Sequence, residues 1–183
     1  MLFQIVSFLL DVVGSLLTGA CLVRLYMQLQ RIPFGNPLGR LVFALSDWIV
    51  MPLRRVIPPS GRWDVSSLAA ALLLQLAQYA ILGLLLGAGA GGWAWLPWLA
   101  LFGLVRIGVS GLIGLLIIYA VLSWVQARSP LSDVIERLCN PVLRPLRRFI
   151  PLVGGVDLSP LVALVLLQVV MIVLGNLQAA MLR

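Results

Sequence analysis

The chain alternates between long apolar stretches and shorter stretches in which arginine, proline and glycine gather. Four apolar stretches are long enough to cross about 30 Å of hydrocarbon, because an α-helix rises about 1.5 Å per residue. They are Phe3–Leu29, Leu68–Leu86, Leu96–Trp124 and Leu161–Leu182. The first is too long for the core of a signal peptide and has no basic residue ahead of it, so we expect it to be retained. The pattern predicts an all-α membrane protein with four transmembrane helices.

Two further stretches are shorter and amphipathic. In Leu38–Met51, and again in the stretch that begins at Leu131, apolar residues recur at helical spacing while charged residues fall on the opposite side. This pattern predicts an interfacial helix on the inner leaflet in each case. Proline is tolerated at a helix start and interrupts a helix elsewhere. The two helices should therefore begin near, and end at, the following prolines: Pro37 and Pro52 for the first, Pro130 and Pro145 for the second.

One half of the chain repeats the other. Residues 52–75 and 145–168 align without a gap at an offset of 93 and share fourteen identical residues, including a basic P-L-R-R-x-I-P segment and a D-x-S segment. Such a match indicates one structural unit used twice, so we assign residues 1–90 to a first repeat and residues 91–183 to a second. Each repeat contains two spans and one interfacial helix. Because the number of spans per repeat is even, the two repeats should be parallel.

Composition and charge place the protein in a membrane and orient it. Apolar residues make up 62% of the chain and charged residues 10%, and the mean hydropathy is +1.10, far outside the usage of soluble proteins. All thirteen basic residues are arginine, and ten lie in the two loops inside the repeats. By the positive-inside rule both loops should be cytoplasmic and both termini outside, in a multi-pass protein of the bacterial inner membrane. This orientation accounts for the +7 net charge, so we expect no nucleic-acid partner.

The residue types exclude several chemistries for this chain acting alone. Histidine is absent, and the two cysteines, Cys21 and Cys139, do not stand at a metal-binding spacing. Zinc sites, histidine-ligated haem and Ser-His-Asp catalysis are thereby excluded. Clusters of acid–base groups are also missing from the sequence. We therefore predict no catalytic residue, no metal, no cofactor and no enzymatic activity.

The arginine pairs of the two P-L-R-R-x-I-P segments are the candidate binding residues: Arg54, Arg55, Arg147 and Arg148. The flanking prolines are expected to hold the backbone extended, so that neighbouring arginines point in different directions. Arginine presents a planar fork that suits phosphate or carboxylate. The segments could therefore grip lipid phosphate or present a basic face to an acidic protein, and both interpretations stay open.

Polar residues at the start of, and inside, the second span of each repeat are expected to have structural roles. The candidate helix caps are the D-x-S residues: Asp64, Ser66, Asp157 and Ser159. The serine oxygen should accept hydrogen bonds from free amides, and the aspartate should complement the positive end of the helix dipole. Gln75 and Gln168 lie nine residues beyond the serines, about 13 Å by helical rise. We expect them to form hydrogen bonds between helices, with the lining of a polar pore as the alternative.

The first and third spans should cross one another. Small residues, which close helix approach requires, stand at matching positions of the two repeats: Ser15 and Thr18, Gly108 and Gly111. Leu104 is the repeat equivalent of Asp11, so in parallel repeats Arg106 lies two residues, or about 3 Å, deeper than Asp11. A charge inside a membrane is usually paired. We therefore predict an Asp11–Arg106 ion pair between these helices, whereas Arg24 should reach the cytoplasmic head groups.

The paired motifs also carry a family resemblance. P-L-R-R-x-I-P, followed by G-x-x-D-x-S and an apolar helix, occurs twice in a chain with four spans. In these features the chain resembles the YggT (YGGT-repeat) family of small bacterial inner-membrane proteins and their plastid relatives. The second copy is closer to the family pattern, with Asn140 and Pro141 ahead of the motif. The first copy has Asp47 and Trp48 at those positions, and it has Ser67 where the second copy has Pro160.

The resemblance implies a function in outline. Family members are associated with osmotic or salt tolerance, with division-site or nucleoid organisation and, in plastids, with maturation of a cytochrome complex, and the family implies no catalytic residues. We expect a non-enzymatic inner-membrane scaffold or assembly factor whose basic loops meet anionic lipid or a partner protein. The expected partners are anionic lipids of the inner leaflet, together with another protein or further copies of the chain. The alternative is a homo-oligomeric ion or osmolyte channel or transporter component built from these residues: Asp11, Arg106, Gln75 and Gln168.

Overall fold

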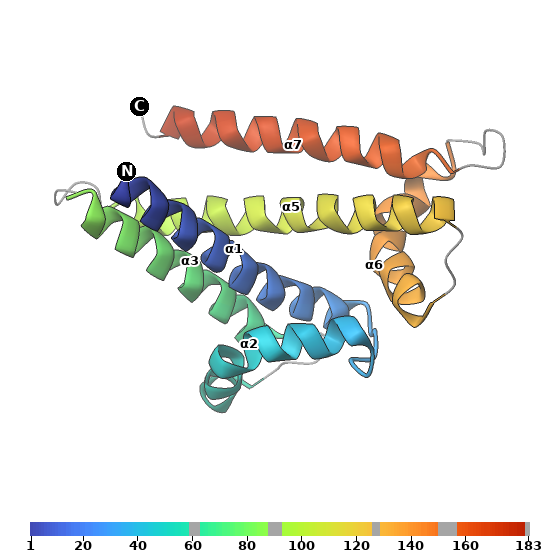
Figure 1. Ribbon diagram of the computed structural model, residues 1–183, viewed down its shortest axis with the longest axis horizontal. Helices are drawn as coiled ribbons and strands as arrows, with labels where there is room; N and C mark the ends of the chain where they lie inside the picture. The colour runs from blue at the N-terminus through green and yellow to red at the C-terminus, as the bar shows by residue number, and fades with distance from the viewer. Residues whose placement is uncertain (59–62, 88–92, 126–128, 150–156, 182–183) are drawn as a thin grey trace.

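The computed structural model describes residues 1–58, 63–87, 93–125, 129–149 and 157–181. Within these ranges the elements are α-helices (Figure 1). In chain order they are α1 (Leu2–Leu29), α2 (Pro37–Val56), α3 (Val65–Leu85), α5 (Leu96–Val125), α6 (Pro130–Leu146) and α7 (Ser159–Met181). The all-helical fold class predicted from the sequence is confirmed.

Four of these helices are long and apolar enough to span a membrane: Phe3–Leu29, Val65–Leu85, Leu96–Val125 and Ser159–Met181. They match the predicted spans to within a few residues. The second and fourth begin earlier than predicted because the serine of each D-x-S segment, Ser66 or Ser159, lies in the first turn of the helix. Few of their side chains are buried in the isolated chain, and large apolar residues dominate their exposed surface, as expected for helices that face lipid.

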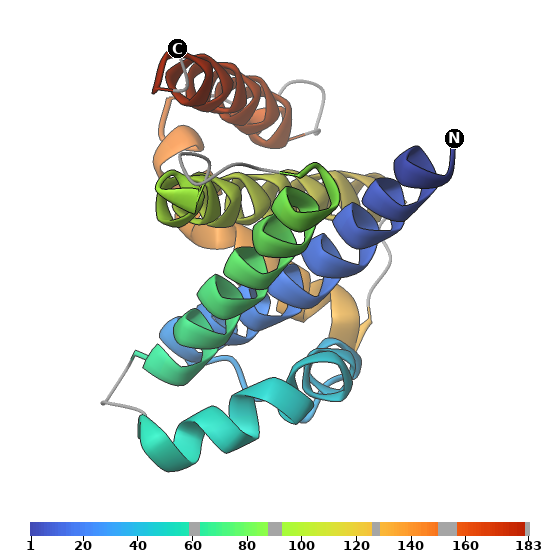
Figure 2. The ribbon, with the colours of Figure 1, turned by 90° about the vertical axis from the view of Figure 1, so that its left-hand side faces the viewer.

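The spans form two antiparallel pairs, α1 with α3 and α5 with α7 (Figure 1). The pairs are inclined to one another (Figure 2) and touch mainly where α5 lies against α3 and α1. Both termini lie at one end of the bundle, and α2 and α6 pack at the ends of their own pairs away from the termini (Figure 1). Each repeat therefore consists of two spans with one short helix folded against them.

The short helices begin as predicted, because each start is capped. The side chain of Asn36 accepts a hydrogen bond from the amide of Gly39 at 2.8 Å, which caps α2. Ser129 and Ser132 form a reciprocal capping box at the start of α6, with each hydroxyl accepting from the other residue's amide. Such caps satisfy amides that the helix itself leaves without partners.

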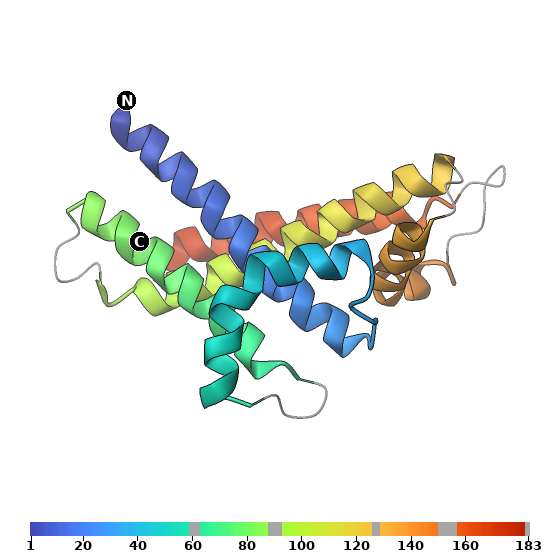
Figure 3. The ribbon, with the colours of Figure 1, turned by 60° about the horizontal axis from the view of Figure 1, so that its bottom comes forward.

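The predicted end of α2 is wrong by four residues, and that of α6 differs by one. Helix α2 continues through Pro52 to Val56, and α6 continues through Pro145 to Leu146. Each proline removes only one backbone donor, and the amides beyond it keep their helical bonds: Ile57 donates to Leu53 at 2.7 Å and Arg147 donates to Leu143 at 2.9 Å. The cost shows instead as a bend, because α2 changes direction part-way along its length (Figure 3).

This helical continuation overturns the predicted extended conformation of the arginine pairs. Arg54 and Arg55 lie in the last turn of α2. Arg147 is the C-cap of α6 with helical backbone angles, and Arg148 follows it in a turn. Consecutive helical residues point about 100° apart, so the two arginines of each pair still leave in different directions.

Three clusters of buried residues hold the elements together. One joins α5, α6 and α7 around Leu116 and Leu143. A second joins α1, α2 and α3 around Cys21 and Val50, and reaches α5 at Leu104. The third packs the end of α1 against α6 around Met27, Leu138 and neighbouring residues. Since the second and third clusters draw residues from both repeats, the two halves form one interlocked unit.

Candidate functional site

The two P-L-R-R motifs form the same ion pair. In the first repeat, Nη2 of Arg54 donates to Oδ2 of Asp64 at 2.5 Å. In the second, Nε of Arg147 donates to Oδ2 of Asp157 at 2.8 Å. These residues correspond at the repeat offset. In both repeats the first arginine of the motif therefore ties the end of a short helix to the start of the next span.

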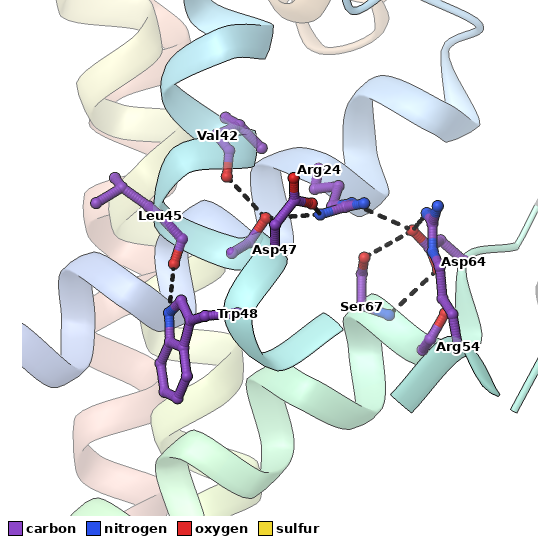
Figure 4. A network of polar contacts seen from close by, with 10 residues as sticks. Arg24, Val42, Leu45, Asp47, Trp48, Arg54, Asp64 and Ser67 are labelled. Atoms are coloured by element: carbon purple, nitrogen blue, oxygen red, sulfur yellow. Dashed lines mark hydrogen bonds and ion pairs between the residues drawn. The ribbon is translucent and has the colours of Figure 1, made fainter. Parts of the chain in front are cut away.

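Asp64 is the centre of a larger network at the start of α3 (Figure 4). Its carboxylate is fully buried and accepts from the hydroxyls of Ser66 at 2.7 Å and Ser67 at 2.6 Å, and from the amide of Ser67 at 3.3 Å. The aspartate, not the serine, therefore caps the helix, which reverses the roles expected from the sequence. Asp157 does the same in the second repeat, where it accepts from the amide of Ser159 at 2.9 Å.

Burial and hydrogen bonding act in opposite directions on the two aspartates. Burial by itself raises the pKa of Asp64, but the hydrogen bonds from Ser67, Ser66 and Arg54 outweigh it and the pKa lies below its ordinary value. The pKa of Asp157 is lowered in the same way, by Ser159 and Arg147 against burial. Both carboxylates are thus held in the charged form that the ion pairs need.

Arg24 belongs to this network, which corrects the prediction that it reaches the head groups. Its side chain is only 2% exposed, and Nη1 donates to Ser46 at 2.9 Å and to Asp47 at 2.6 Å (Figure 4). Its Nε lies 3.8 Å from Asp64, and the guanidinium stacks over the ring of Phe43. Helix α2 folds back over the end of α1 and covers Arg24 before its side chain can reach a membrane surface.

A difference between the two repeats is the sequence signal for this network, and a prediction based on their similarity misses it. Arg24, Ser46 and Asp47 are polar in the first repeat, whereas their equivalents at the repeat offset are Ile117, Cys139 and Asn140. A charged pair present in only one copy marks a local feature. Arg24 and Asp47 are two charged residues that the first copy has and the second lacks.

The second arginine of each pair is arranged differently from the first. Arg55 and Arg148 are both exposed. Among the residues that the structure describes, neither lies within ion-pair distance of a carboxylate, whereas Arg54 and Arg147 each do. The candidate binding residues thus divide into two that are used inside the chain and two that face outward.

The repeat-related tyrosines have separate partners. Tyr119 accepts a hydrogen bond from Nη2 of Arg147, and the guanidinium lies over its ring. Its equivalent Tyr26 instead donates its hydroxyl to the backbone carbonyl of Leu138 on α6 at 2.8 Å. Tyr26 therefore links the two repeats, and Tyr119 supports the Arg147–Asp157 pair.

Inside the spans, Asp11 has a different partner from the one predicted. It accepts from Nε2 of Gln78 at 2.8 Å, Gln78 accepts from Gln75 at 2.9 Å, and Gln75 also donates to Thr18 at 3.4 Å. Arg106 is exposed, and the ion pairs found in the described ranges do not include it. A neutral amide on the neighbouring α3 reaches Asp11, so the predicted Asp11–Arg106 pair does not form.

The two glutamines at the repeat offset have unequal surroundings. Gln75 is buried and bonds to α1, as expected for an interhelical contact. Gln168 on α7 is exposed and makes no side-chain hydrogen bond within the part of the chain that the structure describes. The difference has a simple cause, because Thr18, the partner of Gln75 on α1, corresponds to Gly111 in the second repeat.

Glycines set how closely the spans approach. A Cβ at Gly19 would lie 3.8 Å from Ile107, and one at Gly108 would lie 3.8 Å from Leu22, so α1 and α5 do meet at small residues. Gly111 has open space around it. The tightest fit is at Gly103, where an added Cβ would collide with the amide oxygen of Gln75. The side chain of Gln75 thus fills the space that the missing side chain of Gly103 leaves.

Comparison with known proteins identifies the family. The CCB3/YggT family model matches residues 3–85 and 98–178. The chain belongs to the CCB3/YggT family. It is 36% identical over 168 residues to YggT of Escherichia coli K12, covering 90% of this chain and 86% of that protein. It is 35% identical over 177 residues to PA0392 of Pseudomonas aeruginosa, covering 94% and 89%. No solved structure matches the chain.

The two matched segments of the CCB3/YggT model agree with the internal duplication. The first contains α1, α2 and α3, and the second contains most of α5, together with α6 and most of α7. Within the described residues, no group of histidine, cysteine, aspartate and glutamate side chains is arranged to hold a metal ion. The candidate functional features are therefore the two arginine–aspartate pairs and the outward arginines beside them.

Proposed function

We propose that the protein is a non-enzymatic membrane scaffold or assembly factor. In this proposal the two basic loops rest on anionic lipid of the inner leaflet, and Arg55 and Arg148 dock an acidic partner protein there. One observation carries the proposal: the same motif in both repeats holds one arginine inside the chain and leaves the other exposed, with no carboxylate at ion-pair distance among the described residues. A pair of matched, outward guanidinium groups on rigid supports suits recognition of carboxylate or phosphate.

The proposed orientation follows from charge. Ten arginines lie in the loops that hold α2 and α6, so these helices are placed at the cytoplasmic surface of the bacterial inner membrane and both termini outside. The outward face of α2 supports contact with lipid, because Leu41, Trp48 and Met51 are all exposed there. An apolar face bordered by arginine is typical of a helix that lies in the head-group region.

Helix α6 presents a different surface. Its exposed residues are largely polar, among them Asp133, Glu136, Arg137 and Arg144. A face of this kind is suited to water or to a protein rather than to acyl chains. The two repeats therefore offer an apolar face on α2, suited to acyl chains, and a polar face on α6, suited to head groups, water or a protein. A scaffold between membrane and partner requires surfaces of both kinds. Osmotic tolerance, cell division and assembly of a membrane complex are the processes that the family resemblance suggests for such a scaffold.

The test is crosslinking and affinity purification of the tagged chain from native membranes, with partners identified by mass spectrometry. The variant R55Q/R148Q removes both outward arginines. The matched control R31Q/R40Q removes two other exposed arginines and the same charge. We expect a specific acidic protein with the wild type and the control, at least about fivefold depleted with R55Q/R148Q, because charge-assisted hydrogen bonds contribute more than about 1 kcal/mol each. Recovery of the same proteins from all three would contradict the proposal.

A second candidate function is an ion or osmolyte pathway in a homo-oligomer. The polar chain from Asp11 through Gln78 and Gln75 to Thr18 supports it, because polar residues inside spans often mark ion paths. Ion flux in proteoliposomes separates the candidates. The variant D11N should abolish flux if the pathway exists, whereas a scaffold gives no flux with either protein.

A further inference from the structure

A shallow cleft lies between the end of α1 and the outward side of α6. It has a volume of about 360 Å³ and is lined by Gln30, Arg137, Asn140, Pro141 and Arg144. None of these residues belongs to the P-L-R-R motifs or to the networks around Asp64 and Asp157. The cleft is thus a separate feature of the second short helix.

The lining of the cleft is rich in hydrogen-bond donors. Arg137 and Arg144 are seven residues apart, or two helical turns, and so lie on one side of α6 about 10 Å apart. Among the residues that the structure describes, neither forms an ion pair, although Asp133 and Glu136 lie on the same helix. The amides of Gln30 and Asn140 add neutral donors. Two guanidinium groups with no carboxylate partner favour an anion in the space between them.

The walls of the cleft are fixed in place. Tyr26, one turn before Gln30, donates its hydroxyl to the carbonyl of Leu138 on α6 at 2.8 Å. Met27 and Leu138 belong to one buried cluster that packs the end of α1 against α6. Gln30 and the arginines are therefore held near one another before any ligand arrives, which lowers the entropy cost of binding.

The first repeat has no such lining. The residues that correspond to Arg137 and Arg144 are Ala44 and Met51, and Pro141 corresponds to Trp48. Trp48 and Met51 belong to the apolar side of α2 that the scaffold proposal assigns to lipid. The basic cleft therefore does not follow from the duplicated fold, and its side chains are particular to the second copy.

We propose that this cleft binds a phosphate group, presented by the head group of an anionic phospholipid. The choice of phosphate follows from the two guanidinium forks, which match phosphate oxygens. The choice of lipid follows from position, because Gln30 comes directly after the last residue of the first span, Leu29. A phosphate at the boundary of the bilayer core is at that depth. The site does not depend on the partner of the proposed scaffold and uses neither Arg55 nor Arg148.

The experiment measures lipid binding to the full-length protein in a neutral maltoside detergent. Native mass spectrometry counts bound dioctanoyl-phosphatidylglycerol during a titration, and thermal unfolding is followed in parallel. Dioctanoylglycerol, which has the same chains without phosphate, and inorganic phosphate alone are the comparison ligands. The variants are R137Q/R144Q, the single R137Q and the charge-matched control R31Q/R40Q.

We expect one tightly held phosphatidylglycerol on the wild type and on R31Q/R40Q. R137Q/R144Q should bind it about tenfold more weakly or worse, equivalent to about 1.4 kcal/mol, with R137Q in between. Equal affinity in all variants, or equal binding of dioctanoylglycerol, overturns the proposal. Inorganic phosphate that binds as tightly as the lipid, and only when both arginines are present, supports the phosphate site and overturns its assignment to lipid. Unfolding temperatures without ligand show whether each variant is folded.

Discussion

Arg147 donates to Asp157 at 2.8 Å, and the equivalent Arg54 donates to Asp64 at 2.5 Å. Both pairs connect the end of a short helix to the start of the next span. Each also includes an aspartate that caps this span through a backbone amide. The duplicated motif is therefore first a structural device, which sets how each short helix lies against its own spans. Its second arginine remains available for other contacts.

The lowered pKa values of the two aspartates predict how stability depends on pH. A carboxyl group whose pKa is lower in the folded than in the unfolded state stabilises the fold above its unfolded pKa, about 3.9 for aspartate, and this stability is lost as the pH falls through the folded pKa. The unfolding temperature in detergent should therefore drop below about pH 4. The variant D157N should be less stable at pH 7. Its unfolding temperature should also fall less steeply with decreasing pH on the acid side of the curve, here called the acid limb.

Asp133 is the control for this prediction, because it is exposed on α6 and lies outside the ion pairs found in the described ranges. D133N should keep the wild-type acid limb. An acid limb that D157N leaves as steep as in the wild type would show that other groups cause the loss.

Arg24 should be the arginine whose loss costs most. Its guanidinium is buried between two aspartates, and removing one member of a buried charged network typically costs about 3 kcal/mol or more. R24M should destabilise the protein by roughly this amount, measured by unfolding in a detergent–denaturant titration, whereas R40Q on the exposed side of α2 should change it by less than about 0.5 kcal/mol.

A double-mutant cycle identifies the partner of Arg24. Since Asp47 accepts a hydrogen bond from Arg24 at 2.6 Å, the combined loss in R24M/D47N should be smaller than the sum of the single losses by at least about 0.5 kcal/mol. Strict additivity would mean that this contact contributes nothing to folding.

Two glycines on α5 should respond oppositely to alanine. At Gly103 a methyl group collides with the buried amide of Gln75 and comes within 2.9 Å of Tyr79, and overpacking of this kind costs about 1 to 3 kcal/mol. Moving Gln75 aside would break its bonds to Gln78 and Thr18. At Gly111 the space is open, so G111A should be neutral or stabilising by up to about 1 kcal/mol. Thermal unfolding of G103A and G111A checks this prediction. Equal changes in unfolding temperature would contradict the described packing of α3 against α5.

Cys139 should be unreactive until the protein unfolds. Its side chain is 1% exposed, and burial raises the pKa of the thiol to about 12, against an ordinary value of 9.0. Because the thiolate is the reactive form, maleimide should label a C21A variant at least about a hundredfold faster in denaturant than in detergent. The variant C21A/C139S/E136C carries its thiol at an exposed position on α6, outside the spans, and should label rapidly in both conditions.

Much of the fold could be predicted from the sequence because the bilayer restricts the possibilities. Span lengths, the two short helices and the duplication follow from apolar run length, helical spacing and direct alignment. The ends of the short helices could not be predicted from proline alone. Pro52 and Pro145 each remove a single hydrogen bond, and the helix continues because Ile57 and Arg147 still find their carbonyl partners.

The polar contacts were harder to predict because they depend on which helix lies nearest. Depth along the span placed Asp11 beside Arg106, but α3 brings Gln78 closer. Position near a span end favoured a membrane-facing Arg24, but α2 folds over it and offers Asp47. Neither outcome follows from one helix considered by itself, since each depends on how a neighbouring helix packs.

The division of work between adjacent arginines is the central claim, and one comparison tests it most directly. R54Q/R147Q and R55Q/R148Q are each compared with the wild type for unfolding temperature in detergent and for yield of the crosslinked partner in native membranes. R54Q/R147Q should unfold about 5 °C lower or more, because two partly buried ion pairs are lost. R55Q/R148Q should unfold within about 1 °C of the wild type yet lose the partner. If R55Q/R148Q is the less stable variant, or if it keeps the partner, the assignment of separate roles to the two arginines is wrong.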